Sequence, residues 1–186
     1  MKRLSVLALV TLLATSAAAR AAEYVADPAR SSLTFSGTQD GEPFDGRYRS
    51  FDARVAVDDA TGLPTRITAR IDVKSADTRN AERDQALGTA EFFDYARFPS
   101  ARFRTRACRS AAAKPACDAE LTIRDRTRPL RFPFTWTMQP DGRAKLEATV
   151  VVKRLQFDVG SGDWADTSMI GDDVTVRVSL VLGRRP

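Results

Sequence analysis

The side chains that carry most enzyme chemistry are scarce in this chain of 186 residues, which contains no histidine and only two cysteines. Without histidine there is no Ser-His-Asp or Cys-His nucleophile, no imidazole acid or base, and no histidine ligand for zinc, copper or haem. Two cysteines are too few for a thiolate metal cage or an iron–sulfur cluster. The composition therefore predicts no metal site and no cofactor, and leaves carboxylates, Lys, Tyr and Arg as the groups available for catalysis.

The carboxylates with the most suggestive spacing lie in one short segment, where Asp84 follows Arg83 and precedes Glu91 and Asp94. Two carboxyl groups in different environments can act as a general acid and a general base. The same residues serve equally well as helix caps and ion pairs in a loop, and their spacing specifies no reaction. We therefore expect a protein that is not an enzyme, and keep catalysis by carboxylates near Asp84 as an alternative.

The first 21 residues have the three parts of a secretory signal peptide. Lys2 and Arg3 give a positive start, an apolar run follows, and Ala19 and Ala21 are the small residues that precede a cleavage site. The apolar run is shorter than the roughly 20 residues that a membrane-spanning helix needs. The sequence therefore predicts cleavage before residue 22 and a periplasmic location.

Cleavage would leave one domain, residues 22–186, with a modest charge. It would remove Lys2, Arg3 and Arg20 and no acidic residue, so the net charge falls from +5 to +2. A net charge of this size is ordinary for a soluble surface. We therefore expect no nucleic-acid partner.

The two cysteines, Cys108 and Cys117, are nine positions apart. An even number of cysteines in an exported chain favours a disulfide, which here would join neighbouring strands. A catalytic redox pair is the alternative, but the pair lacks the C-x-x-C spacing of such sites.

Alternation of apolar and polar residues is the dominant pattern after the signal peptide, and it is typical of strands with one buried face. Short turns between the strands indicate antiparallel pairing, and long strands favour a barrel. The pattern predicts an all-β, elongated, antiparallel barrel of about eight strands, with a bulge near residues 49–50. The inner faces begin at Leu33, Phe44, Ile67, Ala101, Leu121, Leu130, Leu146 and Val174.

Residues 75–98 break the alternation. Asp77 or Thr78 is a suitable N-cap for a short helix and Gly88 a suitable end. Aromatic residues follow closely before Pro99. We expect this segment to form a short helical cap over one end of the barrel and to act as a gate.

The inner faces of the barrel combine large aromatic residues with small ones such as Ala53 and Ala69. A barrel of this size either fills its interior or holds one small ligand, and small inner residues leave room for an apolar one. A charge at Phe134 is expected to abolish binding. The residues expected to bind the ligand are Phe35, Phe44, Phe51, Ile67, Ile71, Leu87, Phe92, Phe93, Phe98, Phe103, Leu121, Leu130, Phe132, Phe134, Trp136, Val150 and Phe157.

Short segments in a fixed order along the mature chain resemble one family. They are YVADPARSSLTF at 24–35, RDQAL at 83–87, EFFD at 91–94, LTIRD at 121–125, TRPL at 127–130 and RLQF at 154–157. In these segments the chain resembles the YceI family of periplasmic, polyisoprenoid-binding, lipocalin-like proteins. The resemblance implies an extended antiparallel barrel that holds a long lipid in its lumen and performs no catalysis.

The resemblance also indicates a function and partners. It implies a long-chain isoprenoid, an isoprenoid quinone or a fatty-acid-like lipid as ligand, held for transport, storage or a stress response. A homodimer and a transient contact with the inner membrane are further candidate partners. Two alternatives stay open: a lipid-modifying enzyme that uses carboxylates near Asp84, and a packed structural barrel without ligand.

Overall fold

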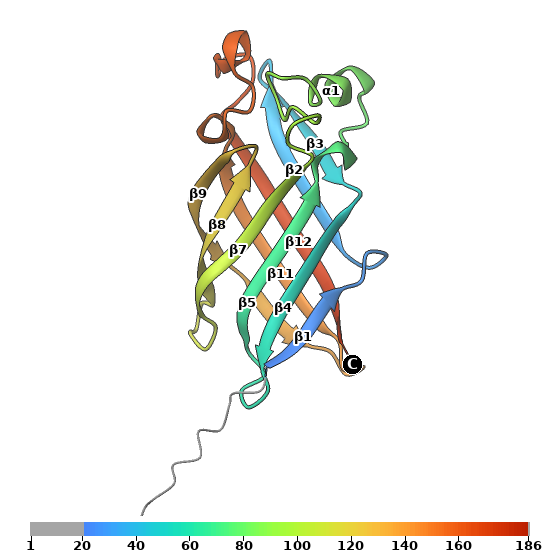
Figure 1. The fold of residues 1–186 in the computed structure, drawn as a ribbon, viewed down its shortest axis with the longest axis vertical. Coiled ribbons are helices and arrows are strands. Elements are labelled where there is room, and N and C mark those ends of the chain that lie inside the picture. The colour runs from blue at the N-terminus through green and yellow to red at the C-terminus, as the bar shows by residue number, and fades with distance from the viewer. Residues whose placement is uncertain (1–20, 186) are drawn as a thin grey trace, which may run out of the picture.

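The computed structural model describes residues 21–185, so the predicted signal peptide lies outside the described residues except for Ala21. Twelve antiparallel strands form one sheet that wraps into an elongated barrel (Figure 1). The strands are β1 (Ala21–Ala26), β2 (Ser32–Gln39), β3 (Glu42–Tyr48), β4 (Phe51–Asp58), β5 (Pro64–Asp72), β6 (Ala76–Asp77), β7 (Ser100–Arg109), β8 (Ala116–Ile123), β9 (Arg126–Pro133), β10 (Thr135–Met138), β11 (Ala144–Lys153) and β12 (Asp173–Arg184). The helices are α1 (Ala81–Ala86) and the short 3₁₀ turns η1 (Val73–Ser75), η2 (Arg154–Phe157) and η3 (Gly162–Ala165).

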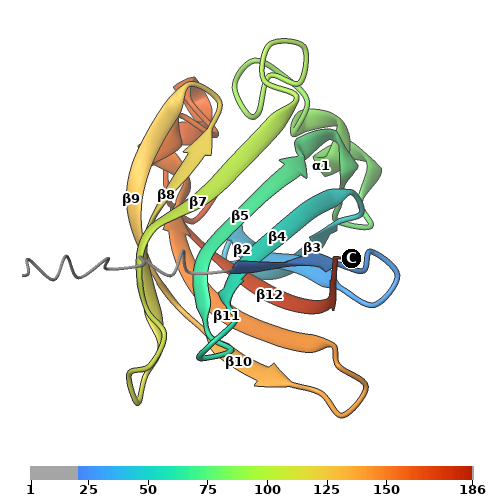
Figure 2. The ribbon, with the colours of Figure 1, turned by 60° about the horizontal axis from the view of Figure 1, so that its bottom comes forward.

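Twelve strands occupy eight positions around the barrel. Both β1 and β2 pair with β12, while β4 pairs with β1 and β3 pairs with β2. At four positions around the barrel, a break in the chain divides one long strand into two successive strands. These divided strands are β1 with β2, β3 with β4, β5 with β6, and β9 with β10. The pairing of β10 with β11 closes the ring, which Figure 2 shows obliquely from the bottom of Figure 1. The predicted all-β barrel is confirmed, and the predicted count of eight describes its positions rather than its separate strands.

The interruptions follow from local sequence. Pro28 has no N–H to donate to a neighbouring strand, and it lies in the turn between β1 and β2. The break between β3 and β4 falls at residues 49–50, where the apolar pattern changes its parity. Between β9 and β10 the N–H of Phe134 donates to the carbonyl of Pro115, 3.1 Å away, instead of joining the ladder.

One end of the barrel is filled by side chains. Leu146 and Leu182 have no exposed surface there. The rings of Tyr24 and Trp136 meet edge to face with centroids 5.8 Å apart, and the indole N–H donates to the carbonyl of Gly62 at 3.0 Å. Full burial of each large apolar side chain contributes about 1.5–3 kcal/mol. This packed end carries the turn between β4 and β5, at the bottom of Figure 1.

The predicted disulfide is confirmed. Cys108 of β7 and Cys117 of β8 are directly opposite each other, with Cα atoms 4.0 Å apart. Residues 110–115 form the exposed end of this hairpin, away from the capping segment (Figure 1). The bridge therefore closes a short loop without touching the opposite end of the barrel.

Reduction of this disulfide is expected to lower the free energy of unfolding by roughly 2–3 kcal/mol, because a short closed loop restricts the unfolded chain. Urea unfolding with and without reductant measures the difference. The double variant Cys108→Ala, Cys117→Ala should give a similar loss in both conditions. A variant that still responded to reductant would contradict this account.

The predicted helical segment over one end of the barrel is confirmed, but its predicted N-cap is wrong. The Asn80 side chain caps α1 by accepting from the N–H of Arg83 at 2.9 Å. Asp77 and Thr78 precede the helix and make other contacts. The helix ends at Ala86, just before the predicted stop.

Candidate ligand-binding cavity

An apolar cavity occupies the barrel between the packed end and the capping segment. Only Tyr48 and Arg154 among its lining residues have polar side chains. The lining comprises Leu33, Phe35, Tyr48, Phe51, Ala53, Ile67, Ala69, Ile71, Phe93, Ala101, Phe103, Leu121, Ile123, Leu130, Phe132, Leu146, Val150, Val152, Arg154, Val159, Val174, Val176, Val178 and Leu180.

The cavity is long relative to its volume. Its volume is about 170 Å³, and its lining extends along β11 from Leu146 to Val152 and along β12 from Val174 to Leu180. Seven residues of an extended strand span roughly 20 Å, so the space is narrow for its length. Such a shape suits a slender chain better than a compact ligand.

Ten of the seventeen predicted binding residues line this cavity, and they come from strands far apart in the sequence. They are Phe35, Phe51, Ile67, Ile71, Phe93, Phe103, Leu121, Leu130, Phe132 and Val150.

The other seven predicted residues lie elsewhere. Trp136 packs in the closed end of the barrel beside Tyr24, and Phe134 is buried outside the cavity lining. The ring of Phe44 lies under the guanidinium of Arg83, 4.2 Å from it. Leu87, Phe92, Phe98 and Phe157 belong to the cap and its neighbouring loops. Phe134 is buried against Phe132, with ring centroids 6.2 Å apart. A charge at Phe134 is therefore expected to unfold the wall rather than to act on binding alone.

Fourteen lining residues were not in the predicted set. Ala53, Ala69, Ala101 and the β12 valines lie on the predicted inner faces, so the alternation could have found them. Tyr48 continues the inner face that begins at Phe44, so the same pattern includes it. Arg154 had no such signal, because a charged residue counts against an inner face.

The cap over the open end of the barrel consists of the capping segment and the loop between β11 and β12. This loop is organised around the side chain of Arg154, a residue that is only 5% exposed. All five of its N–H groups donate to main-chain carbonyls. The acceptors are Gly171 (3.1 Å), Val159 (3.0 Å), Gly160 (2.9 Å), Trp164 (2.7 Å) and Ile170 (2.7 Å). Burial lowers the pKa of Arg154, and the nearby Asp172 opposes this shift. One cation thus fixes the loop between β11 and β12.

This loop is joined to the capping segment. The carbonyl of Glu91 accepts from the N–H groups of Gly160 (2.7 Å) and Ser161 (2.9 Å). Arg124 adds a second link, since its Nη1 donates to the carbonyls of Phe92 (2.9 Å) and Asp158. A Cβ at Gly160, whose φ is +74°, would lie 2.2 Å from the Arg154 guanidinium, so only glycine fits there.

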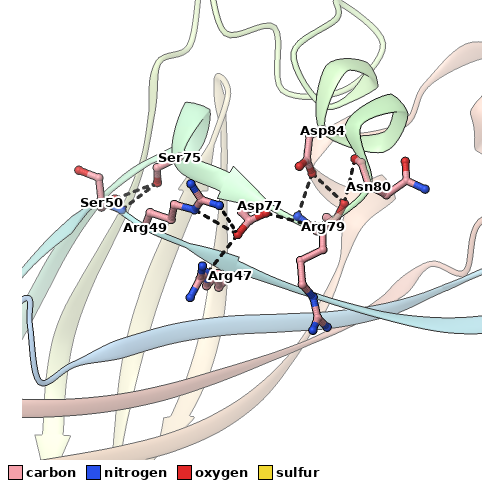
Figure 3. Close-up of polar contacts among 9 residues, drawn as sticks. Arg47, Arg49, Ser50, Ser75, Asp77, Arg79, Asn80 and Asp84 are labelled. Carbon is pink, nitrogen blue, oxygen red and sulfur yellow. Dashed lines mark hydrogen bonds and ion pairs between the residues drawn. The ribbon is translucent and has the colours of Figure 1, made fainter.

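The beginning of the capping segment is fixed to the barrel wall by Asp77 (Figure 3). Its carboxylate accepts from Arg49 at 2.7 and 3.1 Å and from Arg47 at 3.1 Å, both next to or on β3. The N–H of Arg79 also donates to it at 3.2 Å. The hydrogen bond from Arg49, then those from Arg79 and Arg47, hold the pKa of Asp77 at about 2.

Substitution Asp77→Asn is expected to lower stability at neutral pH and to flatten the acid limb of the stability curve. The folded pKa of about 2 lies below the ordinary value of 3.8, so the contribution is present above about pH 3.8 and is lost as pH falls towards 2. Denaturant unfolding across this pH range measures both effects. Asp45→Asn, which changes an exposed carboxylate on β3, the strand that pairs with β6, is the control and should leave the curve unchanged. Parallel curves for the wild type and Asp77→Asn would contradict the assignment.

The predicted alternative catalytic carboxylates make local contacts outside the cavity lining. Asp84 accepts from the N–H and hydroxyl of Thr78 at 2.9 and 2.7 Å, and Asp94 pairs with Arg97 at 3.4 Å. The pKa of Glu91 is lowered by hydrogen bonds from the N–H of Glu91 itself and from the Thr89 side chain. A general acid needs the opposite shift.

Within residues 21–185, no helix combines the length and the apolar character needed to cross a membrane. No group of three or more His, Cys, Asp or Glu side chains in this part of the chain is placed to hold a metal ion.

The fold and cavity together define a β-barrel of the kind that encloses an apolar lumen. A family model for the YceI-like domain matches residues 24–182, and the chain belongs to this family. A UPF0312 protein of Pseudomonas putida (strain W619) is 28% identical over 184 residues, covering 94% of this chain and 95% of that protein. This relationship extends over nearly the whole length of both proteins.

Solved structures share the fold. BcnA of Burkholderia cenocepacia is 27% identical, with a TM-score of 0.77 over 84% of this chain and 98% of that one. A polyisoprenoid binding domain from Saccharophagus degradans, implicated in plant cell wall breakdown, is 14% identical, with a TM-score of 0.70 over 89% of this chain and 100% of that one.

Proposed function

We propose that this protein binds one long-chain lipid, a polyisoprenoid or a similar amphiphile such as an isoprenoid quinone or a fatty-acid-like molecule, in its barrel lumen. The observation that carries the proposal is the narrow apolar cavity, packed at one end and covered by loops at the other. Each methylene removed from water contributes about 0.8 kcal/mol, so a long chain binds well even with few hydrogen bonds. Ordering of the chain reduces this gain.

Two further facts support a lipid ligand over the alternatives. Empty apolar space argues against a barrel that serves only as a packed scaffold. The structural contacts of Asp84 and Asp94 and the lowered pKa of Glu91 argue against catalysis. The related fold from Saccharophagus degradans is named for polyisoprenoid binding, which agrees with the chemistry of this cavity.

The proposed location is the periplasm. The disulfide between Cys108 and Cys117 fits an oxidising compartment. The predicted signal peptide, residues 1–21, fits the same route. Transport, storage or a stress response between membranes follows as the proposed role, with a transient inner-membrane contact and a homodimer as proposed partners.

Mass spectrometry of organic extracts from protein purified from the periplasm tests the proposal. We expect a long-chain lipid at close to one molecule per chain. Delipidated protein should gain thermal stability when an isoprenoid is added back, because a ligand that binds only the folded state stabilises it. No extracted lipid and no thermal shift would overturn the proposal.

A further inference from the structure

Two polar residues line the cavity, and only Tyr48 has a side-chain polar group without a hydrogen-bond partner among residues 21–185. Among the lining residues only Tyr48 and Arg154 have polar side chains. Arg154 donates all five of its N–H groups to main-chain carbonyls and has none left for a ligand. No residue in the described range 21–185 forms a hydrogen bond with the Tyr48 hydroxyl.

The Tyr48 hydroxyl is open to the space around it rather than sealed. Arg124 Nε is the sole side-chain polar atom of the described residues that is both fully buried and unpaired. The Tyr48 hydroxyl is also unpaired, so it would belong to the same group if it were fully buried. It is therefore not fully buried and keeps accessible surface. A hydroxyl that stays unpaired in an apolar site costs free energy, and a ligand oxygen would remove this cost.

The position of Tyr48 is fixed by its strand neighbours. It lies opposite Leu33 of β2 on one side and Ala76 of β6 on the other, at the level where the capping segment leaves the barrel. Its ring is 5.1 Å from that of Phe35. Burial, followed by the nearby Tyr95, raises the pKa of the Tyr48 hydroxyl, so it stays protonated and able to donate at physiological pH.

We propose that Tyr48 selects the head of the ligand by donating a hydrogen bond to an uncharged oxygen, such as a carbonyl, hydroxyl or ether. The inference rests on the proposed lipid-binding function and deepens it. The protein would then prefer a neutral oxygenated lipid to a pure hydrocarbon of the same chain length. A phosphate in the lumen would have no free cation beside it, since Arg154 is the only cation in the lining.

The test compares Tyr48→Phe with the wild type in binding geranylgeraniol and the hydrocarbon that lacks only its hydroxyl. Displacement of a fluorescent lipid from delipidated, full mature protein gives both affinities. The matched control is Tyr24→Phe, which makes the same change in the packed end of the barrel, outside the cavity lining. Circular dichroism and thermal unfolding check that the variants are folded.

We expect Tyr48→Phe to weaken geranylgeraniol binding about three- to tenfold, the usual value of a neutral hydrogen bond. Hydrocarbon binding should not change, and Tyr24→Phe should change neither affinity. Equal effects of Tyr48→Phe on both ligands, or no effect on either, would overturn the role of Tyr48 and leave the lipid-binding function standing. A wild type that bound neither the fluorescent lipid nor the two ligands would instead overturn the proposed function, and this inference with it.

Discussion

Replacing Arg154 with methionine is expected to lower the free energy of unfolding by about 3–5 kcal/mol. Methionine keeps much of the apolar length of the side chain but donates no hydrogen bond. Five main-chain carbonyls would lose their partner, and the residues that carry them lie between 159 and 171. Hydrogen bonds to a charged group are the stronger class, and acceptors left unpaired in a buried site add to the cost.

The loss should be local before it is global. The loop between β11 and β12 is tied to the capping segment through the Glu91 carbonyl, so both should open together. Hydrogen exchange should speed up at Gly160 and Ser161, while the packed end of the barrel stays protected. Urea unfolding measures the stability change, and exchange followed by mass spectrometry measures where it occurs.

Arg177→Met is the matched control for this prediction. Arg177 makes one hydrogen bond, to the Ser36 hydroxyl at 3.2 Å, on the exposed outer face of the barrel. Its replacement should cost less than about 0.5 kcal/mol, as for most surface changes. If the two variants unfolded at the same urea concentration, the Arg154 network would not be what holds the cap.

The barrel could be predicted from the sequence because strand alternation reports directly which residues face inwards. The alternation does not show how far along the barrel axis each inward-facing side chain lies, and so whether it meets the cavity or the closed end. Phe132 and Trp136 share one predicted face, yet one lines the cavity and the other packs in the closed end. The position along the axis is set by the register between neighbouring strands, which depends on contacts distant in the sequence. This explains why only part of the predicted binding set meets the cavity.

The organisation of the cap could not be predicted for a different reason. Arg154 is held by main-chain carbonyls, and every residue has one, so no residue type marks the acceptors. The alternation places Tyr48 on an inner face with Phe44 and Gly46, but it does not show whether the hydroxyl at the end of the ring has a partner. A functional role for either residue becomes visible only when the hydrogen-bond partners are known.

Substitution Ala69→Phe is expected to weaken lipid binding about 100-fold while leaving the barrel folded. Ala69 lines the cavity between Ala53 and Phe103 on the neighbouring strands, so the new ring would enter the lumen. If the ring excludes about four methylene-sized units of the ligand, roughly 3 kcal/mol of binding free energy is lost, and 1.4 kcal/mol corresponds to tenfold. Free space in the lumen accepts the ring, so the overpacking cost of a filled core does not arise.

The adjacent residue provides the control, because consecutive strand residues face opposite sides. Thr68→Phe places the same ring on the outer face, where Thr68 lies between Arg54 and Arg104. Lipid displacement should then show a loss for Ala69→Phe only, with similar thermal unfolding for both variants. Equal affinities in the two variants would mean that the ligand does not occupy the lumen at the level of Ala69. If both variants lost lipid affinity, the ligand would contact the outer wall, and the lining of the lumen would not explain its binding.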